Sequence, residues 1–394
     1  MERVVLHVDM DNYFAAVEEK YNPALRNIPF AVCGDPAMRH SITMSKNSLA
    51  KSAGVRTGIR FAQARQICPQ LGYVKADMPK YLAEARAARE IYLKYTDIIV
   101  PYGMDESWVI FENGVTFDEA RQLADVIRIE IKYSLGLSAS VGVSYNYIFS
   151  KLGSDLNKPN GTTLITKDNY RGIVWPLPAS ELLFVGNARK EILTRAGIHT
   201  IGDIAQSDSK KLERLLGKVG YDLWCFSNGD DRNFKPNNDE IGSIGNTLTP
   251  PADLRNNEEV SAVIYLIANA ISTRLKKHSL KSRCISISIR DNKFNKTIRQ
   301  RSIGRPTDNV NNIFNNAYDL FLKNYKWDNP LRSIGVRADN LNKDNQLSLF
   351  DEDCSIIVDI DTRVKALTRK FGELRFESSA TTKEWEPCVD AIVV

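Results

Sequence analysis

The chain has 394 residues, which is too long for one compact core and suits about two to four domains. Apolar residues make up 43% and charged residues 26%, a balance that excludes a disordered or fibrous protein. No apolar run approaches the roughly 20 residues of a membrane-spanning helix, the first residues do not read as a secretory signal, and the six cysteines form no C-x-x-C pair. We therefore expect a cytoplasmic protein with reduced thiols and no membrane partner.

The net charge of +5 is unevenly distributed. Between Arg274 and Arg305 there are eleven Lys or Arg residues and one acid, Asp291, whereas from Asp344 to the end eleven acids outnumber six basic residues. A basic stripe suits a polyanion, because neutralising phosphates releases condensed counterions. A solvated basic face is the alternative, and charge alone does not separate the two.

The first half of the chain alternates strand and helix patterns. Residues 4–8 predict a buried strand that ends at Asp9, and residues 12–19 predict a turn into a helix. Short strands and a small helix near 48–53 follow, then a helix over about 80–95. Two further strands, 98–102 and 107–111, predict a hairpin whose turn carries Asp105 and Glu106; a helix at 117–133 and a strand at 137–143 come next. This order predicts a mixed sheet backed by helices.

The second half has short helical pieces and then a separate strand-rich unit. Hairpin-like turns lie near 185–188 and 216–220, and the polar segment 227–243 is the clearest linker. Residues 244–340 read as strand, helix, strand, strand, helix, strand, with strict alternation at 284–290. One more helical pattern covers about 359–371.

Asp9, Asp105 and Glu106 are candidates for metal ligands. Phosphoryl transfer to a sugar hydroxyl is served by two Mg²⁺ ions about 3.5–4 Å apart, and hard cations need oxygen ligands. Taken alone, the signal is weak, because acids at strand ends and in turns are commonly solvated.

Four motifs in order change that assessment. They read DMDNYFAAVE (9–18), GMDESW (103–108), SVGVSYN with SDLNKPNG (140–146 and 154–161), and IHTIGDI (198–204). This set resembles the motifs of the Y-family translesion DNA polymerases, especially the bacterial DNA polymerase IV-like group. The resemblance runs from residue 4 to about 340.

The resemblance implies an α/β (α+β) right-hand polymerase that adds deoxynucleotides to a primer 3′ end, with low fidelity, in DNA repair. It implies a monomer that binds primer-template DNA and deoxynucleoside triphosphates. The implied domains are palm (1–13 and 76–166), small fingers (14–75), helical thumb (167–234), linker (235–243), βαββαβ little finger (244–341) and tail (342–394).

The resemblance also assigns residues to the active site. Asp9, Asp105 and Glu106 would be the catalytic metal ligands for two Mg²⁺ ions, with the Met10 carbonyl completing one site. Asp11 would instead cap the turn into the following helix. Phe14 would be a steric gate against ribose, with core packing as the alternative reading for it and for Tyr13.

The nucleotide contacts are expected from Tyr13, Phe14, Ser45, Lys51 and Lys158, with the triphosphate nearest Lys158. The family places Tyr and Arg, three residues apart, where this chain has Ser48 and Lys51. Lysine keeps the charge but loses the two-pronged guanidinium contact, so this part of the site departs from the family pattern.

DNA and partner contacts are expected outside the palm. The thumb turns would bind phosphates through Gly186 and Lys218, although Asn187 and Ala188 depart from the usual Gly-Ile-Gly. The little-finger sheet would present Ser286, Ser288, Arg290, Arg299 and Arg301 to the backbone on one face. In the tail, QLSLF (346–350) resembles the peptide by which bacterial polymerases dock on the sliding clamp, with Gln346, Leu347, Leu349 and Phe350 as contacts.

Two other functions remain open at this stage. A DNA- and clamp-binding protein with a weakened active site would explain Ser48 and Lys51. Another two-metal palm enzyme, such as a nucleotidyl cyclase, is disfavoured by the thumb, little-finger and clamp motifs.

Overall fold

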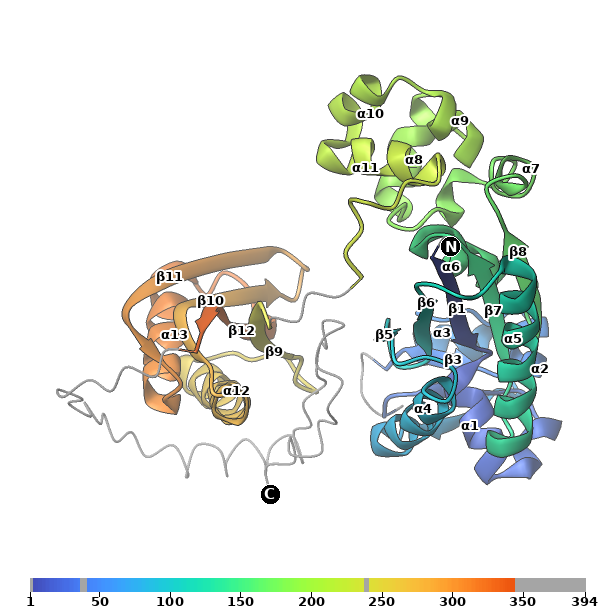
Figure 1. Cartoon of the computed structure of the whole chain (residues 1–394). Coiled ribbons are helices and arrows are strands. Elements are labelled where there is room, and N and C mark those ends of the chain that lie inside the picture. The colour runs from blue at the N-terminus through green and yellow to red at the C-terminus, as the bar shows by residue number, and fades with distance from the viewer. Residues whose placement is uncertain (1–2, 36–40, 237–240, 344–394) are drawn as a thin grey trace. The chain divides into compact units, whose positions relative to one another are not determined.

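The computed structural model describes residues 3–35, 41–236 and 241–343, and these form two compact units, one before residue 237 and one after residue 240 (Figure 1). Among these residues no helix is long and apolar enough to cross a membrane. The four cysteines that lie in them, Cys33, Cys68, Cys225 and Cys284, are buried and free.

A five-stranded mixed sheet forms the centre of the first unit. Its strands are β1 (Val4–Met10), β5 (Ile99–Pro101), β6 (Glu106–Phe111), β7 (Ala139–Ser144) and β8 (Thr162–Ile165), in the order β5-β6-β1-β7-β8. β1 pairs antiparallel with β6 and β7, and all its residues are buried. The predicted hairpin of two strands around Asp105 is confirmed by β5 and β6.

Helices cover both faces of this sheet. They are α4 (Met78–Tyr92), α5 (Phe117–Glu130) and α6 (Tyr147–Leu156). Leu6 and Val8 pack into a core that includes α4 and α5, and the alternate residue His7 contacts α6. A capping box between Thr116 and Glu119 starts α5, and a π-helical turn (Ile131–Leu135) extends it.

A small sheet with its own core lies next in the chain. Its strands are β2 (Phe30–Cys33), β3 (Thr43–Lys46) and β4 (Gly72–Lys75), in the order β3-β2-β4. The surrounding helices are α1 (Tyr13–Tyr21), η1 (Pro23–Asn27), α2 (Ser48–Ser52) and α3 (Phe61–Ile67). Asn47 caps α2 by accepting from the Ala50 N–H, which explains why so short a helix forms there.

Short helices make up the rest of the first unit. They are α7 (Tyr170–Val174), η3 (Ala179–Glu181), α8 (Asn187–Arg195), α9 (Ile201–Gln206), α10 (Ser209–Leu216) and α11 (Lys218–Ser227). Their apolar faces share one core with residues of α6.

The second unit is a four-stranded antiparallel sheet with two helices on one face. Its elements are β9 (Ser243–Leu248), α12 (Asn257–Lys277), β10 (Lys281–Asp291), β11 (Lys296–Thr307), α13 (Val310–Asn324) and β12 (Leu331–Asn342). The sheet order is β11-β10-β12-β9. The predicted succession of strand, helix, strand, strand, helix and strand is confirmed, and Ile285, Ile287 and Ile289 face the helices.

Candidate active site

Asp9 and Glu106 lie opposite each other on neighbouring strands. In the antiparallel pair of β1 and β6 they are direct partners, so their side chains leave the same face of the sheet. The Met10 N–H donates to the carbonyl of Asp105 (3.1 Å), which fixes Asp105 beside the end of β1. Gly103, at φ +96°, makes the turn that brings both acids of the hairpin here.

Two lysines neutralise two of these acids. Lys158 Nζ lies 2.7 Å from Asp9 Oδ2 and 2.7 Å from Asp155 Oδ1. Lys151 pairs with Glu106. Sequence reasoning named Lys158 but missed Lys151, which lies on α6 one helical turn before Asp155, the second partner of Lys158.

The pKa values of the three acids are shifted by burial and by the charges around them. Burial, and then the charge of Glu106, raises the pKa of Asp9 to about 7 and that of Asp105 to about 6. Burial alone would raise the pKa of Glu106, but the His7 ring and the Lys151 ammonium lower it below its ordinary value. Two of the three carboxylates are therefore held where ionisation is unfavourable without a further cation.

The donor set fits a hard divalent cation, because carboxylate oxygens are the ligands such ions prefer. In the described ranges of the chain, no three His, Cys, Asp or Glu side chains are already drawn together as a ligand group. Asp9 and Glu106 hold lysines instead. The three acids are adjacent on the backbone, and the side chains of Asp9 and Glu106 are paired with lysines of the protein itself.

His7 is a site residue that the sequence did not reveal. Its Nδ1 lies 2.8 Å from Ser154 Oγ, and its Nε2 lies 3.4 Å from Glu106 Oε2. Complete burial lowers the pKa of His7 to about 4. The alternation of β1 places His7 on the same face as Asp9, which was the available signal.

Asp11 does not cap the following helix, so that prediction is wrong. The residue at the N-cap of α1 is Asn12, which makes no capping hydrogen bond. The Asp11 carboxylate accepts from Ser140 Oγ (2.8 Å) and from the Asn160 N–H (2.8 Å). Asp11 is buried between β7 and the loop that carries Lys158, because these long-range donors satisfy both of its oxygens.

Phe14 stacks on Tyr81 with ring centroids 4.6 Å apart, and it keeps partial exposure. Tyr81 is buried and donates its hydroxyl to Glu18 (2.6 Å). Tyr13 is buried as well and donates to the Tyr81 carbonyl. The structure thus shows Tyr13 in the core, whereas Phe14 is only partly buried.

The fingers residues lie in different environments. The Ser45 hydroxyl donates to the Asn12 carbonyl (3.2 Å) and lies 3.4 Å from the Ala15 N–H, so it supports the start of α1. Lys51, in the last turn of α2, is exposed, as is Ser48. Triphosphate contacts by Ser45 and Lys51 stay predictions.

The two predicted thumb turns both lead into helices. Gly186 is the N-cap of α8. Gly217, at φ +69°, is the N-cap of α11, whose first residue is Lys218. Backbone N–H groups at such helix starts are oriented as phosphate ligands require.

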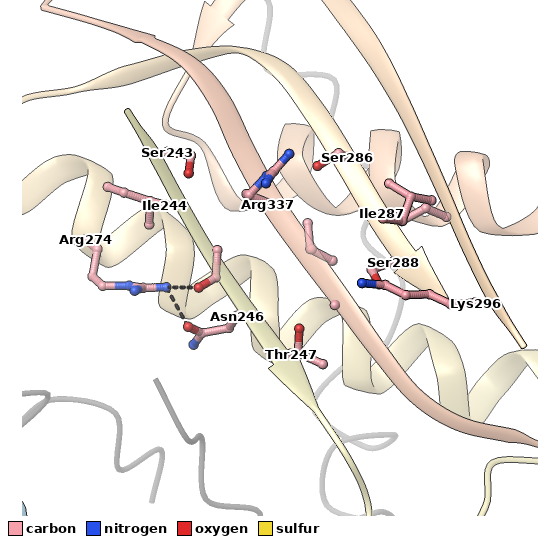
Figure 2. A pocket seen from close by; sticks show the side chains of 14 residues that line it. Ser243, Ile244, Asn246, Thr247, Arg274, Ser286, Ile287, Ser288, Lys296 and Arg337 are labelled. Atoms are coloured by element: carbon pink, nitrogen blue, oxygen red, sulfur yellow. Dashed lines mark hydrogen bonds between the residues drawn. The ribbon is translucent and has the colours of Figure 1, made fainter. Parts of the chain in front are cut away.

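One face of the second unit's sheet is open and hollowed (Figure 2). Arg337 lies across from Ser286 on one side and Gly245 on the other, so these residues share that face. The hollow, about 260 Å³, forms where glycines replace side chains: a Cβ at Gly335 would lie 2.4 Å from Thr247 Oγ1. Lys296, Ser288 and Arg337 border it in Figure 2.

The expectation that the arginines of β11 share this face is wrong. Arg299 and Arg301 pair directly with Ile287 and Ile285, so they leave the sheet on the helix side. Arg301 Nη1 lies 2.6 Å from Asp319 Oδ2 of α13. Contact of these two arginines with DNA stays a prediction, and it would have to occur on the helix side of the sheet.

The remaining predicted residues of β10 differ in exposure. Ser286 is buried and donates to Asp339 Oδ2 (3.0 Å), whereas Ser288 and Arg290 are partly exposed. The predicted clamp contacts, Gln346, Leu347, Leu349 and Phe350, lie outside the described residues.

Comparison with known proteins agrees with this architecture. The impB/mucB/samB family model matches residues 8–155, and the model of that family's C-terminal domain matches residues 242–349. A DNA polymerase IV of Acetivibrio thermocellus is 42% identical over 360 residues, 90% of each chain. DNA polymerase IV 1 of Bacillus subtilis is 32% identical over 397 residues, 98% of this chain and 94% of that one.

Among solved structures, a Y-family DNA polymerase chimera has the same fold. Its TM-score is 0.75, at 24% identity, over 86% of this chain and 98% of that one. The fold class predicted from the sequence is therefore confirmed. With the sequence match to its relatives, this places the chain in the impB/mucB/samB family, which comprises the Y-family DNA polymerases of the DNA polymerase IV type.

Proposed function

We propose that this DNA-directed DNA polymerase performs translesion synthesis with Asp9, Asp105 and Glu106 as its reactive centre. The observation that carries the assignment is that β1 and β6 bring the backbones of these acids to one end of the sheet, where burial, and then the charge of Glu106, raises the pKa of Asp9 and Asp105. Such a cluster is unfavourable in the protein alone and becomes favourable when it binds cations.

The family membership implies dependence on a divalent metal, and Mg²⁺ is the ion we propose. When bound, two such ions would activate the primer 3′-hydroxyl and neutralise the leaving pyrophosphate. In the reaction the 3′-oxygen forms a bond to the α-phosphorus, and the bond from that phosphorus to the bridging oxygen of pyrophosphate breaks. Asp9, Asp105, Glu106 and the Met10 carbonyl would supply the ligands.

Lys158 and Phe14 orient the nucleotide in this proposal. The Lys158 ammonium, now on Asp9, lies close enough to the acids to serve a triphosphate bound there. Phe14, held flat against Tyr81, would exclude a ribose 2′-hydroxyl. Tyr13 would act only through packing, and Lys51 and Ser45 would add contacts from the small sheet.

Sequence-independent binding to DNA would come from contacts with the phosphates of the DNA backbone. The N-termini of α8 and α11 and the open face of the second unit, with Lys296, Arg290 and Ser288, offer N–H groups, cations and hydroxyls. Because these groups bind phosphates, affinity should fall steeply with salt.

Primer extension tests the assignment. Wild-type protein with Mg²⁺ and all four deoxynucleotides should extend a primer in the order set by the template, and Asp105→Asn combined with Glu106→Gln should abolish extension. Extension by neither protein would favour the alternative of a DNA- and clamp-binding member with a weakened site. A matched control is Asp97→Asn, an exposed acid of the same unit.

We also propose that residues 346–350 dock on a sliding clamp. The support is the sequence QLSLF, three large apolar residues in a polar tail. Deleting these residues should remove clamp-stimulated processivity while leaving extension without clamp unchanged. Equal processivity of the two proteins on clamp-loaded DNA would contradict the proposal.

A further inference from the structure

The loop that carries Lys158 is held from two sides by residues outside the reactive centre. It spans residues 157–161, between α6 and β8. Gly161 packs so tightly that a Cβ there would lie 2.0 Å from the Asn157 carbonyl oxygen. Asn160 adopts the left-handed conformation (φ +57°), which few side chains tolerate.

Asp11 holds the backbone of this loop. Its Oδ2 accepts from the Asn160 N–H at 2.8 Å, two residues beyond Lys158. Its Oδ1 accepts from Ser140 Oγ at 2.8 Å, and its own N–H donates to the Ser138 carbonyl. Asp11 is 5% exposed, so its hydrogen-bonded carboxylate links the end of β1 to the loop away from competing water.

Arg128 holds the other side of the loop. Its Nη2 donates to the Asn160 carbonyl and to Asn160 Oδ1 (2.9 Å). Its Nη1 donates to Asp125 Oδ1 (2.6 Å) and Thr162 Oγ1 (3.1 Å). The guanidinium therefore ties α5 to both ends of the turn that leads into β8, with the planar fork that only arginine offers.

We propose that Asp11 and Arg128 are positioning residues that set the reach of Lys158 into the nucleotide site. Neither side chain contacts Asp9, Asp105 or Glu106 in the hydrogen bonds of the described residues; both act through Asn160. The inference rests on the proposed role of Lys158 at the triphosphate. Loosening the loop would leave the lysine present but misplaced, which lowers the rate of nucleotide insertion.

A double-mutant cycle in the full-length protein tests this. Arg128→Gln and Asp11→Asn are each measured for single-nucleotide insertion, alone and together with Lys158→Ala. We expect each to reduce kcat/KM roughly tenfold in the wild-type background, the loss typical of residues that orient others. With Lys158→Ala, each should change kcat/KM by less than about twofold, because residues that act through one another are not additive.

Arg121→Gln, an exposed arginine of the same helix, is the matched control and should leave kcat/KM unchanged in both backgrounds. Thermal unfolding identifies any variant that fails to fold. Asp11→Asn is the variant at risk, because Asp11 is buried. If it does not fold, the test rests on Arg128→Gln. Equal losses in the two backgrounds, with Lys158→Ala itself impaired, would overturn the positioning role and leave the proposed polymerase chemistry intact. If Lys158→Ala is unimpaired, Lys158 does not act at the nucleotide site. That result would overturn both the proposed role of Lys158 and the positioning role of Asp11 and Arg128.

Discussion

Phe14 is fixed by its neighbour rather than by its own backbone. The ring stacks on buried Tyr81, and a ring packed in this way can exclude an added hydroxyl by collision. Phe14→Ala should therefore raise ribonucleotide insertion relative to deoxynucleotide insertion by roughly 10- to 200-fold, the range of small steric differences in a pocket.

The measurement is kcat/KM for one ribonucleotide and its matched deoxynucleotide. Phe294→Ala removes an exposed phenylalanine of the second unit and should leave the ratio unchanged. An unchanged ratio in Phe14→Ala would assign that residue to packing alone.

The reactive carboxylates should destabilise the metal-free protein. Because burial and the charge of Glu106 raise the folded-state pKa of Asp105 to about 6, stability is lost as the pH rises from the ordinary pKa of an aspartate to about 6, and the full cost is present above that pH. At pH 8 without divalent metal, Asp105→Asn should raise the melting temperature by roughly 2–4 °C, which corresponds to about 1 kcal/mol for a domain of this size. The same variant should lose primer extension.

Asp97→Asn, which removes an exposed charge, should move the melting temperature little. A lower melting temperature for Asp105→Asn would show that its carboxylate stabilises the fold. That result would contradict the view of a site strained for cation binding.

Single site residues could be predicted from the sequence, but their hydrogen-bond partners could not. Asp9, Asp105 and Glu106 could be named from strand ends and motifs, and β1 and β6 bring them together. The role of Asp11 could not be found, because a carboxylate before a helix has the local pattern of a cap. Its true partners, Ser140 and Asn160, lie more than a hundred residues away in the chain.

Secondary structure elements were predicted well where periodicity was strong. β10 alternates strictly, and its isoleucines face the helices as expected. The face of each β11 residue was not predictable from alternation alone, since a shift of one residue reverses it. The turn at residues 291–295 determines which face each β11 residue takes. In it, Asp291, the lone acid of the basic stripe, accepts from the N–H groups of Lys293 and Asn295. These hydrogen bonds set the register of β11 against β10.

The open face of this sheet makes an ionic prediction. Lys296 is exposed at the hollow, on the face of Ser288 and Arg290. Lys296→Gln should weaken binding to duplex DNA of any sequence and reduce the slope of log affinity against log salt by about one, the effect of a single phosphate contact.

Lys323→Gln is the control for that titration. Lys323 lies on α13, where its ammonium is 2.9 Å from Asp319 Oδ2, away from the open face. Its substitution should leave the salt slope unchanged. If the two variants behave alike, the cations of the unit would contribute only a diffuse field, without a defined phosphate site at Lys296.

Among the described residues, the two units have separate apolar cores. The apolar core of the second unit, drawn from α12, α13 and the four strands, shares no residue with the cores of the first unit. Within the first unit the division is less complete: helical residues 170–227 share a core with α6, and β2 contributes both to the core of the small sheet and to that of the five-stranded sheet. Borders between elements with independent cores can be placed from sequence, because polar, Gly- and Pro-rich segments cannot be buried.

Residues 241–343 should therefore fold without the rest of the chain. Expressed alone, they should give a single cooperative thermal transition and bind duplex DNA with a salt-dependent affinity, because the apolar core and the open face are both complete within these residues. Residues 1–236 should retain template-dependent extension, since Asp9, Asp105, Glu106 and Lys158 all belong to that part. This fragment should need a higher DNA concentration, because it lacks the open face of the second unit.

Adding the second fragment in trans should not restore affinity at micromolar concentration, because the tether supplies an effective concentration of about millimolar. A non-cooperative transition in the isolated 241–343 fragment would show that its core requires the first unit.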